Sequence, residues 1–437
     1  MSSFSDRFHA TFVASEASDP SELAPEVAAA VPSNATRLVS AHTLQNVGDL
    51  VVDAKTVLTW LVAATGAPAA IVGLLVPIRD AGSMVPQVFL APRVRRLAVR
   101  KWVWVGGGLL QAVAVVAMAL VTATLTGTAA GVGLLGTLAV FSLARAASSF
   151  ASKDVLGRTL PKGQRGQISG LSTVGAGLAA ISVGSLMRFV GGQDTPTSTY
   201  AWLLVAAAAV WVAAAAVYSR VREAPGERDD GPAESPIAHA VELLRDDAPF
   251  RRFVTTRSLL LVSALSPPFV VALATERGGA GLQGLGAFVI SSGIAALITG
   301  RFWGRASDRS SRATMQWAAG LSATVIVLFV AAVQVDAIAE LQLVYPGAYL
   351  LLAVAHTGSR IGRKTYVVDL AEGNERTDYI AVSNTAMGLI LLIAGGLSAA
   401  AATIGAEVAL LFLAALGVLG VVVAASLPEV SAGAEHP

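Results

Sequence analysis

Five ionisable residues lie within the first two long apolar stretches of the sequence. They are Asp49, Asp53, Lys55, Arg79 and Asp80. An ionised side chain at membrane depth needs an opposite charge or an aqueous cavity, because hydrocarbon does not solvate it. These residues could therefore bind a charged solute or a coupling proton, since a carboxylate in a cavity can release its proton when access changes. Alternatively, they could form a permanent ion-paired network that only fixes helix packing.

The spacing of these residues predicts that they meet at one depth. Counted outward from an expected turn near Gly66 and Ala67, Asp53 and Asp80 are equally distant, so antiparallel helices would hold both near the membrane midplane. The polar residues of the first stretch follow helical steps and share one face, namely Asn46, Asp49, Asp53, Thr56 and Trp60. Those of the second stretch also share a face, namely Arg79, Asp80, Ser83 and Gln87. Lys55 points nearly opposite and is expected to have a different partner.

Later apolar stretches contain further ionisable residues, among them Arg145, Arg257 and His356. Arg145 in the fourth stretch corresponds to His356 in the tenth when the second half of the chain is shifted back by 211 residues. His356 could titrate near neutral pH or could simply form a hydrogen bond within the bundle. Arg257 lies near one end of the seventh stretch, where its long side chain is expected to reach the interface and to serve a structural role.

The elements that position these residues are membrane spans. Only 14% of the 437 residues are charged, whereas a soluble chain carries about a quarter. Segments of about 20–24 residues, long enough to cross about 30 Å of hydrocarbon, recur along the chain. They are expected near 43–64, 69–92, 102–123, 130–151, 167–189, 199–219, 254–275, 283–303, 313–333, 342–362, 380–402 and 405–427. The sequence thus predicts an all-α polytopic protein of about twelve spans.

Several classes of function are disfavoured by what the sequence lacks. It contains no cysteine, which removes disulfides and thiolate chemistry, and no loop of the kind that cradles nucleotide phosphates. No metal cluster or nucleophile constellation is visible, so an enzyme is not expected, and no cofactor is predicted beyond a possible proton gradient. The net charge of +2 comes from short separated basic clusters and does not indicate nucleic-acid binding.

The basic clusters also predict the topology. They lie near 93–101, 153–165, 220–252, 301–312 and 360–376, and the intervening connections hold almost no Lys or Arg. Cytoplasmic loops of membrane proteins are enriched in Lys and Arg. The chain is therefore expected to cross the inner membrane with both termini in the cytoplasm. The expected parts are a polar N-terminal segment without a signal peptide (1–40), a six-helix bundle (41–219), a cytoplasmic linker (220–252), a second bundle (253–427) and a short tail (428–437).

An internal repeat supports this division into halves. A shift of 213 residues places Phe302 on Phe89 and Arg309 on Arg96, and a shift of 211 residues places Lys364 on Lys153. Two nearly equal offsets from separate loops indicate two six-span halves joined by the linker.

One loop motif resembles the major facilitator superfamily of transporters. The run from Gly304 to Arg312 reads G-R-A-S-D-R-S-S-R and matches the family's G-x-x-x-D-R-x-x-R pattern, whereas in the first half Arg95 stands at the position of the Asp. The resemblance implies two pseudo-repeated six-helix bundles and a cytoplasmic gate whose residues are Gly304, Asp308, Arg309 and Arg312. The Gly-Pro pair of the family's antiporters is absent from the fifth span.

The resemblance implies a secondary transporter for a small-molecule substrate, working by alternating access in the lipid bilayer, with proton coupling and export favoured. No obligate protein partner and no nucleic acid are expected. The candidate substrate- or proton-binding residues are those with charge at membrane depth, namely Asp49, Asp53, Lys55, Arg79, Asp80, Arg145 and His356. An uptake permease for a charged metabolite, a non-transporting receptor or scaffold, and a membrane-embedded enzyme remain the alternatives.

Overall fold

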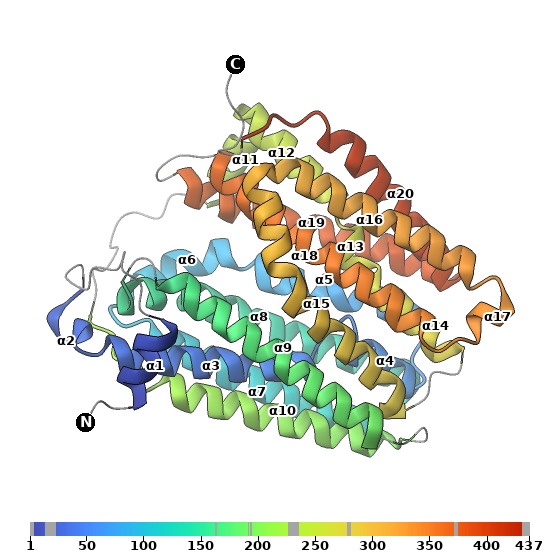
Figure 1. The fold of residues 1–437 in the computed structure, drawn as a ribbon, viewed down its shortest axis with the longest axis horizontal. Coiled ribbons are helices and arrows are strands. Elements are labelled where there is room, and N and C mark those ends of the chain that lie inside the picture. The colour runs from blue at the N-terminus through green and yellow to red at the C-terminus, as the bar shows by residue number, and fades with distance from the viewer. Residues whose placement is uncertain are drawn as a thin grey trace.

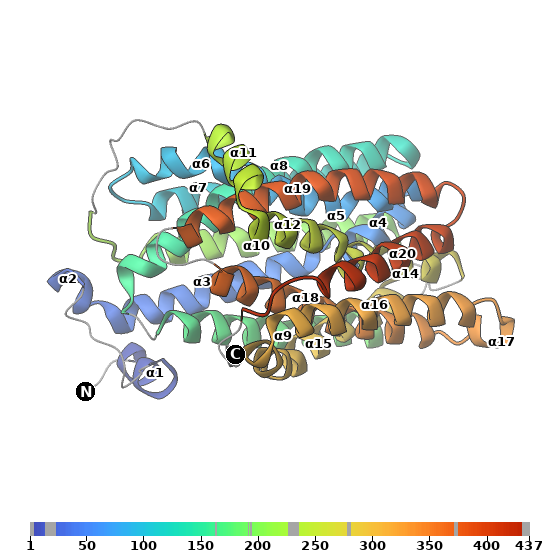
Figure 2. The ribbon, with the colours of Figure 1, turned by 90° about the horizontal axis from the view of Figure 1, so that it is seen from above.

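The computed structural model of the protein describes residues 4–13, 23–161, 164–190, 192, 195–225, 236–277, 281–370 and 375–430. All regular secondary structure in these ranges is helical, which confirms the all-α class. Figure 1 shows the helices of the first half, blue to green, lying against those of the second half, yellow to red. Seen from above, the long helices of both halves run in the same general direction, as expected for a membrane bundle (Figure 2).

The helices are numbered in chain order. The first half contains α1 (Phe4–Phe12), α2 (Pro25–Ala28), α3 (Val31–Val51), α4 (Val57–Ala64), α5 (Ala69–Met84), α6 (Gln87–Arg95), α7 (Lys101–Thr124), α8 (Gly127–Thr159), α9 (Arg165–Val190) and α10 (Thr197–Tyr218). The second half contains α11 (Pro236–Asp246), α12 (Ala248–Leu259), α13 (Val262–Leu265), α14 (Pro267–Glu276), α15 (Gly281–Arg309), α16 (Ser311–Ala332), α17 (Asp336–Ala339), α18 (Val344–Leu370), α19 (Glu375–Ala402) and α20 (Ala406–Ala424).

Nine helical segments of the described chain are long and apolar enough to cross a membrane. The three remaining spans predicted from the sequence fall on α3 with α4, on α5 and on α18. These segments are interrupted, shorter or more charged than the others, and they carry most of the candidate site residues. The polar residues that lower the mean hydropathy of these three segments therefore include most residues of the candidate site.

The first span differs from its prediction because it is broken in the middle. It begins at Val31, earlier than the expected residue 43, and is not helical between Val52 and Thr56. The Asp53 carboxylate oxygen Oδ1 accepts hydrogen bonds from the backbone N–H of Lys55 at 2.9 Å and from the Thr56 hydroxyl at 3.0 Å. Such local side-chain bonds offer the backbone an alternative to the helix. The predicted helical face therefore does not continue from Asp49 to Trp60.

The seventh span is also broken, at the corresponding place in the second half. Helix α12 ends at Leu259, the short helix α13 follows, and α14 starts at Pro267. Proline is favoured at the start of a helix because it has no N–H to donate. Irregular backbone at membrane depth is tolerated where protein covers it or where it borders a cavity. Corresponding breaks in both halves extend the internal repeat seen in the sequence.

Two helices run further than the apolar pattern predicted. Helix α8 continues to Thr159 and α18 to Leu370, although the expected spans end at residues 151 and 362. Hydropathy reports only the apolar part of a helix, so it cannot show polar turns that extend past the hydrocarbon. As a result Lys153 and Lys364, which the sequence places in loops, lie on helices.

The two halves meet mainly along two helix pairs, α5 with α19 and α9 with α15. Glycines allow the close approach: a methyl group added at Gly395 would overlap Pro77, and one added at Gly184 would meet the backbone of Gly286 and Ile290. Small residues at such contacts let helix backbones pack tightly within a bilayer.

Candidate functional site

A cavity of about 660 Å³ lies between the halves at the level of the helix breaks. Its lining comes from both helix breaks and from α3, α5, α8, α12, α18 and α19. Among the described residues, its acidic side chains are Asp49, Asp53 and Asp80, and its basic side chains are Lys55, Arg79, Lys153, Arg257, Arg360, Arg363 and Lys364. All but one of the predicted substrate- or proton-binding residues therefore lie around this single space, and Arg145 contacts it through Asp49.

Asp49 is held by two arginines. Its Oδ1 lies 3.2 Å from Nη2 of Arg79, and its Oδ2 lies 2.7 Å from Nη2 of Arg145. The Arg79 guanidinium also stacks over the ring of Phe141, with its Cζ 4.9 Å from the ring centroid. One carboxylate thus joins α3, α5 and α8. This arrangement matches the ion-paired alternative for Asp49, although the triad still borders the cavity.

Asp53 and Lys55 both line the cavity, contrary to the expectation that Lys55 points away from the charged face. The reason is the break: once the backbone leaves the helix at Val52, residues two apart no longer point to opposite sides. Asp53 has no ion pair within 4.0 Å to another described residue, and the hydrogen bonds that its carboxylate accepts from Lys55 and Thr56 are those that hold the break.

Asp80 is a carboxylate of the cavity without a direct ion pair among the described residues. It is close enough to act as an opposite charge on Lys55, Arg360 and Arg363. Asp80 lines the cavity from the first half, whereas Arg360 and Arg363 line it from the second. The predicted common depth of Asp53, Lys55, Arg79 and Asp80 agrees with their shared cavity.

The second half contributes an arginine that the sequence placed at the interface. Arg257 is buried, with 8% of its surface exposed. Its Nη1 donates to the Ser383 hydroxyl and its Nη2 donates to Oδ1 of Asn384, both at 2.8 Å. Its Nε is buried and has no hydrogen-bond partner in the described chain. The guanidinium is thus fixed in orientation and retains an unused donor.

The apolar pattern did not identify the other basic residues of the second half as site residues, because it places them at the end of the tenth span or in the loop that follows. Arg360, Arg363 and Lys364 follow i, i+3 and i+4 spacing on α18 and share one face. The Nε of Arg363 donates to the Ser359 carbonyl at 3.1 Å. None of the three has an ion pair within 4.0 Å to another described residue, although all three line the cavity. Their helical spacing was the signal available in the sequence.

His356 lies one turn before Arg360 on the same helix and also lines the cavity. Its Nδ1 lies 3.3 Å from the hydroxyl of Ser263, which belongs to the interrupted span. The hydrogen bond agrees with the simpler of the two interpretations of this histidine, while its position agrees with the functional one.

The residues of the facilitator-like motif lie at the end of α15 and the start of α16. A methyl group added at Gly304 would meet no described atom within 4 Å, and Arg309 is exposed. The side chain of Asp308 lies outside the described residues. Arg312 donates to the Leu427 carbonyl at 2.9 Å, and its Nε lies 3.7 Å from Glu429. Its described contacts therefore stay within the second half and attach the chain after α20 to the start of α16.

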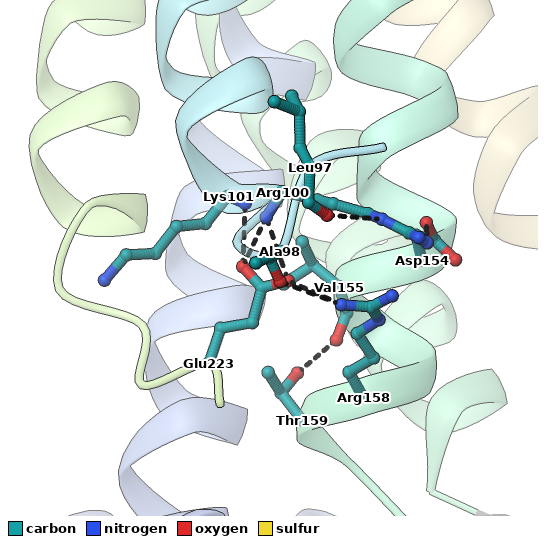
Figure 3. A network of polar contacts seen from close by, with 9 residues as sticks. All are labelled: Leu97, Ala98, Arg100, Lys101, Asp154, Val155, Arg158, Thr159 and Glu223. Atoms are coloured by element: carbon teal, nitrogen blue, oxygen red, sulfur yellow. Dashed lines mark hydrogen bonds and ion pairs between the residues drawn. The ribbon is translucent and has the colours of Figure 1, made fainter. Parts of the chain in front are cut away.

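The first half has a comparable polar network, although it lacks the motif's Asp (Figure 3). The buried carboxylate of Glu223, which follows α10, accepts hydrogen bonds from the backbone N–H groups of Arg100 and Lys101, at 2.8 Å for Lys101. It also lies 3.9 Å from Nη1 of Arg158, while the side chain of Arg100 pairs with Asp154. A carboxylate after the last helix thus contacts the start of the third membrane helix in both halves. Sequence reasoning missed Glu223 and Glu429 because neither lies in the motif.

Three aromatic side chains, from α4, α15 and α18, form a cluster between the two halves. The centroid of the Phe288 ring lies 6.0 Å from that of Trp60 and 5.5 Å from that of Tyr349, and all three residues are buried. The indole N–H of Trp60 donates to the Tyr200 hydroxyl at 3.2 Å. Beyond this aromatic cluster a second hollow, of about 790 Å³, is lined by residues such as Tyr200 and Glu276. The charged cavity instead extends to Lys153 and Lys364, which are exposed at the predicted cytoplasmic end.

Comparison with known proteins shows likeness in structure alone. No protein family model matches the sequence, and no curated protein matches it. A D-xylose–proton symporter has a TM-score of 0.70 at 11% identity, over 92% of this chain and 99% of that chain. The nucleoside transporter NupG has a TM-score of 0.68 at 11% identity, over 90% and 99%.

A transporter of the POT family, crystallised with 5-aminolevulinic acid, has a TM-score of 0.68 at 12% identity, over 90% of this chain and 95% of that chain. Identities this low establish a common fold and no more. The paired six-span halves, the corresponding breaks and these structures agree with the motif of the second half. The chain has the fold of the major facilitator superfamily transporters.

Proposed function

We propose that this protein is a secondary active transporter that moves a small solute across the cytoplasmic membrane by alternating access. The observation that carries the proposal is the charged cavity between the two halves, which extends to the exposed Lys153 and Lys364. We infer that the aromatic cluster closes its other end. Transporters of this architecture place their sites at midplane, between repeats and beside interrupted helices.

Proton coupling is the second part of the proposal. Asp53 and Asp80 face the cavity without an ion pair to any described residue, so each can change protonation without breaking one. Asp49 is less suited to this role because both of its oxygens are bound by arginines. The opening at the predicted cytoplasmic end is where an exporter would load its cargo, and export is therefore proposed.

An uptake permease for a charged metabolite is the second candidate, favoured by the amount of charge around the cavity. It shares the site and the mechanism with the first candidate and differs in the direction of net flux. Vesicles of known orientation distinguish the two.

The test is solute flux in proteoliposomes under an imposed pH gradient. The expected result is that the pH gradient drives movement of at least one solute. Asp80→Asn and Asp53→Asn should each weaken the dependence of flux on the pH gradient, while solute exchange in the absence of a gradient continues. A folded protein that binds solutes but moves none would favour a receptor and contradict the proposal. Unchanged coupling in both variants would remove the proton role.

A further inference from the structure

We propose that the solute is a small organic anion with carboxylate or phosphate groups, and that Arg257, Arg360, Arg363 and Lys364 bind it. This inference rests on the proposed transport function and adds the class of the cargo. It comes from how the charges divide between the two walls of the cavity.

The wall formed by the first half is balanced. Its three acidic residues, Asp49, Asp53 and Asp80, are matched in number by the lining bases Lys55, Arg79 and Lys153, and Arg79 and Arg145 already share Asp49. This wall therefore has little positive charge to offer a ligand.

The wall formed by the second half is not balanced. Its described lining residues include Arg257, Arg360, Arg363 and Lys364 but no acidic side chain. Like charges that share a cavity repel one another, so a bound anion would stabilise all of them. Among the described residues only Asp80, across the cavity, acts on this group from the other half as an opposite charge.

The donors on this wall are prepared for an anion. Ser383 and Asn384 hold the two terminal nitrogens of Arg257, which fixes its plane and leaves its buried Nε without a partner in the described chain. Arg363 uses its Nε on the Ser359 carbonyl, and its Nη1 has only the Met387 sulfur, at 3.8 Å. A guanidinium offers paired N–H groups whose geometry matches a carboxylate or a phosphate.

The size of the cavity limits the ligand. A volume of about 660 Å³ is ordinary for a site that encloses a small organic molecule. Lys153 and Lys364 stand exposed along the same cavity toward the predicted cytoplasmic end, so positive charge lines the route as well as the site. Such a field raises the local concentration of anions.

The first experiment measures binding to the purified full-length protein by thermal shift and by calorimetry. The probes are succinate, citrate and glucose 6-phosphate, with glucose as the neutral probe and putrescine as the cationic one. We expect saturable stabilisation by one or more of the anions and none by glucose or putrescine. Stabilisation by the neutral or cationic probe alone, or by no probe at all, would overturn the assignment of an anion.

Variants test whether the named residues are responsible. Arg363→Gln should weaken anion binding by about tenfold or more, because it removes a charge-assisted hydrogen bond. Arg252→Gln is the matched control, since Arg252 is exposed on α12 outside the cavity. Should Arg363→Gln not fold, Asn384→Ala gives a second test, because it frees one terminal nitrogen of Arg257 without removing charge. Equal weakening in Arg252→Gln, or no weakening in either cavity variant, would contradict the site.

Flux in proteoliposomes separates this inference from the proposed function. If glucose moves and no anion does, the protein is a transporter but its solute is not an anion. If anions bind saturably, Arg363→Gln abolishes that binding, and no probe moves under a pH gradient of either direction, the anion site is supported and the transport function is rejected.

Discussion

At the scale of single residues, opposite charges in this molecule are used in two ways. Asp49 is shared between Arg79 and Arg145 and acts as a junction of three helices. Asp53 and Asp80 remain without direct ion pairs to described residues and face the cavity. The sequence could identify all three, because an acidic residue in an apolar stretch stands out. It could not rank them, since ranking depends on which guanidinium groups the fold brings within 3 to 4 Å.

Asp49→Asn is expected to destabilise the protein. The substitution leaves the guanidinium groups of Arg79 and Arg145 near each other without their shared carboxylate. Loss of one partner from a buried network costs several kcal/mol, and the side chains here are about one-fifth exposed, so a loss of about 1–3 kcal/mol is expected. Thermal melting in detergent measures it, with Asp336→Asn, an exposed acid on α17, as the control. A melting temperature equal to that of the wild type would show that the junction is dispensable.

At the scale of helices, the number of spans follows from composition while their interruptions do not. The apolar pattern correctly placed the turn at Gly66, whose φ of 72° suits glycine, and the turn between α19 and α20. It did not place the break at Val52–Thr56, which depends on hydrogen bonds made by the Asp53 side chain. It also ended α18 too early and so hid the cluster of bases on its last turns.

The start of α7 provides a prediction at this scale. Glu223→Ala removes the carboxylate that accepts from the first N–H groups of α7, and a loss of about 1–2 kcal/mol is expected because the helix end keeps unpaired donors. Glu223→Gln keeps one acceptor and should cost less. Thermal melting of both is compared with Glu242→Ala on the exposed face of α11. Equal melting temperatures for all three variants would show that Glu223 does not stabilise the start of α7.

At the scale of the whole molecule, the two halves are joined mainly by small residues along α5 with α19 and α9 with α15. Two glycines of the fifth span, Gly177 and Gly184, contact α15. Which helix they would meet was not readable from the sequence, because pairing between halves leaves no local pattern. The internal repeat, by contrast, was visible as two offsets and reappears as corresponding breaks and corresponding carboxylates.

Two adjacent glycines test this interface. Gly395→Ala places a methyl group against Pro77 and should cost about 1–3 kcal/mol and slow transport, because the halves must separate to accept it. Gly396→Ala has open space and should change stability by no more than about 1 kcal/mol. Melting and flux are measured for both. Similar behaviour of the pair would mean that the contact between α5 and α19 does not limit movement.

Labelling of introduced cysteines tests access to the two hollows, since the chain has no cysteine of its own. Ser149→Cys lies in the charged cavity and Thr275→Cys in the hollow beyond the aromatic cluster. An impermeant maleimide should modify the first from the predicted cytoplasmic side and the second from the other side. Labelling of both from one side would contradict the topology or the closure.

The paired breaks also divide each of the two interrupted spans into separate helices. A continuous hydrogen-bond ladder passes a tilt along the whole helix, whereas a gap in the ladder absorbs it. Helices α4 and α14 pack against each other across the boundary between halves, while α3 and α12 pack within their own halves. The breaks therefore separate α4 and α14 from the longer helices α3 and α12 of the same spans. We expect the aromatic end to open without an equal movement at the other end.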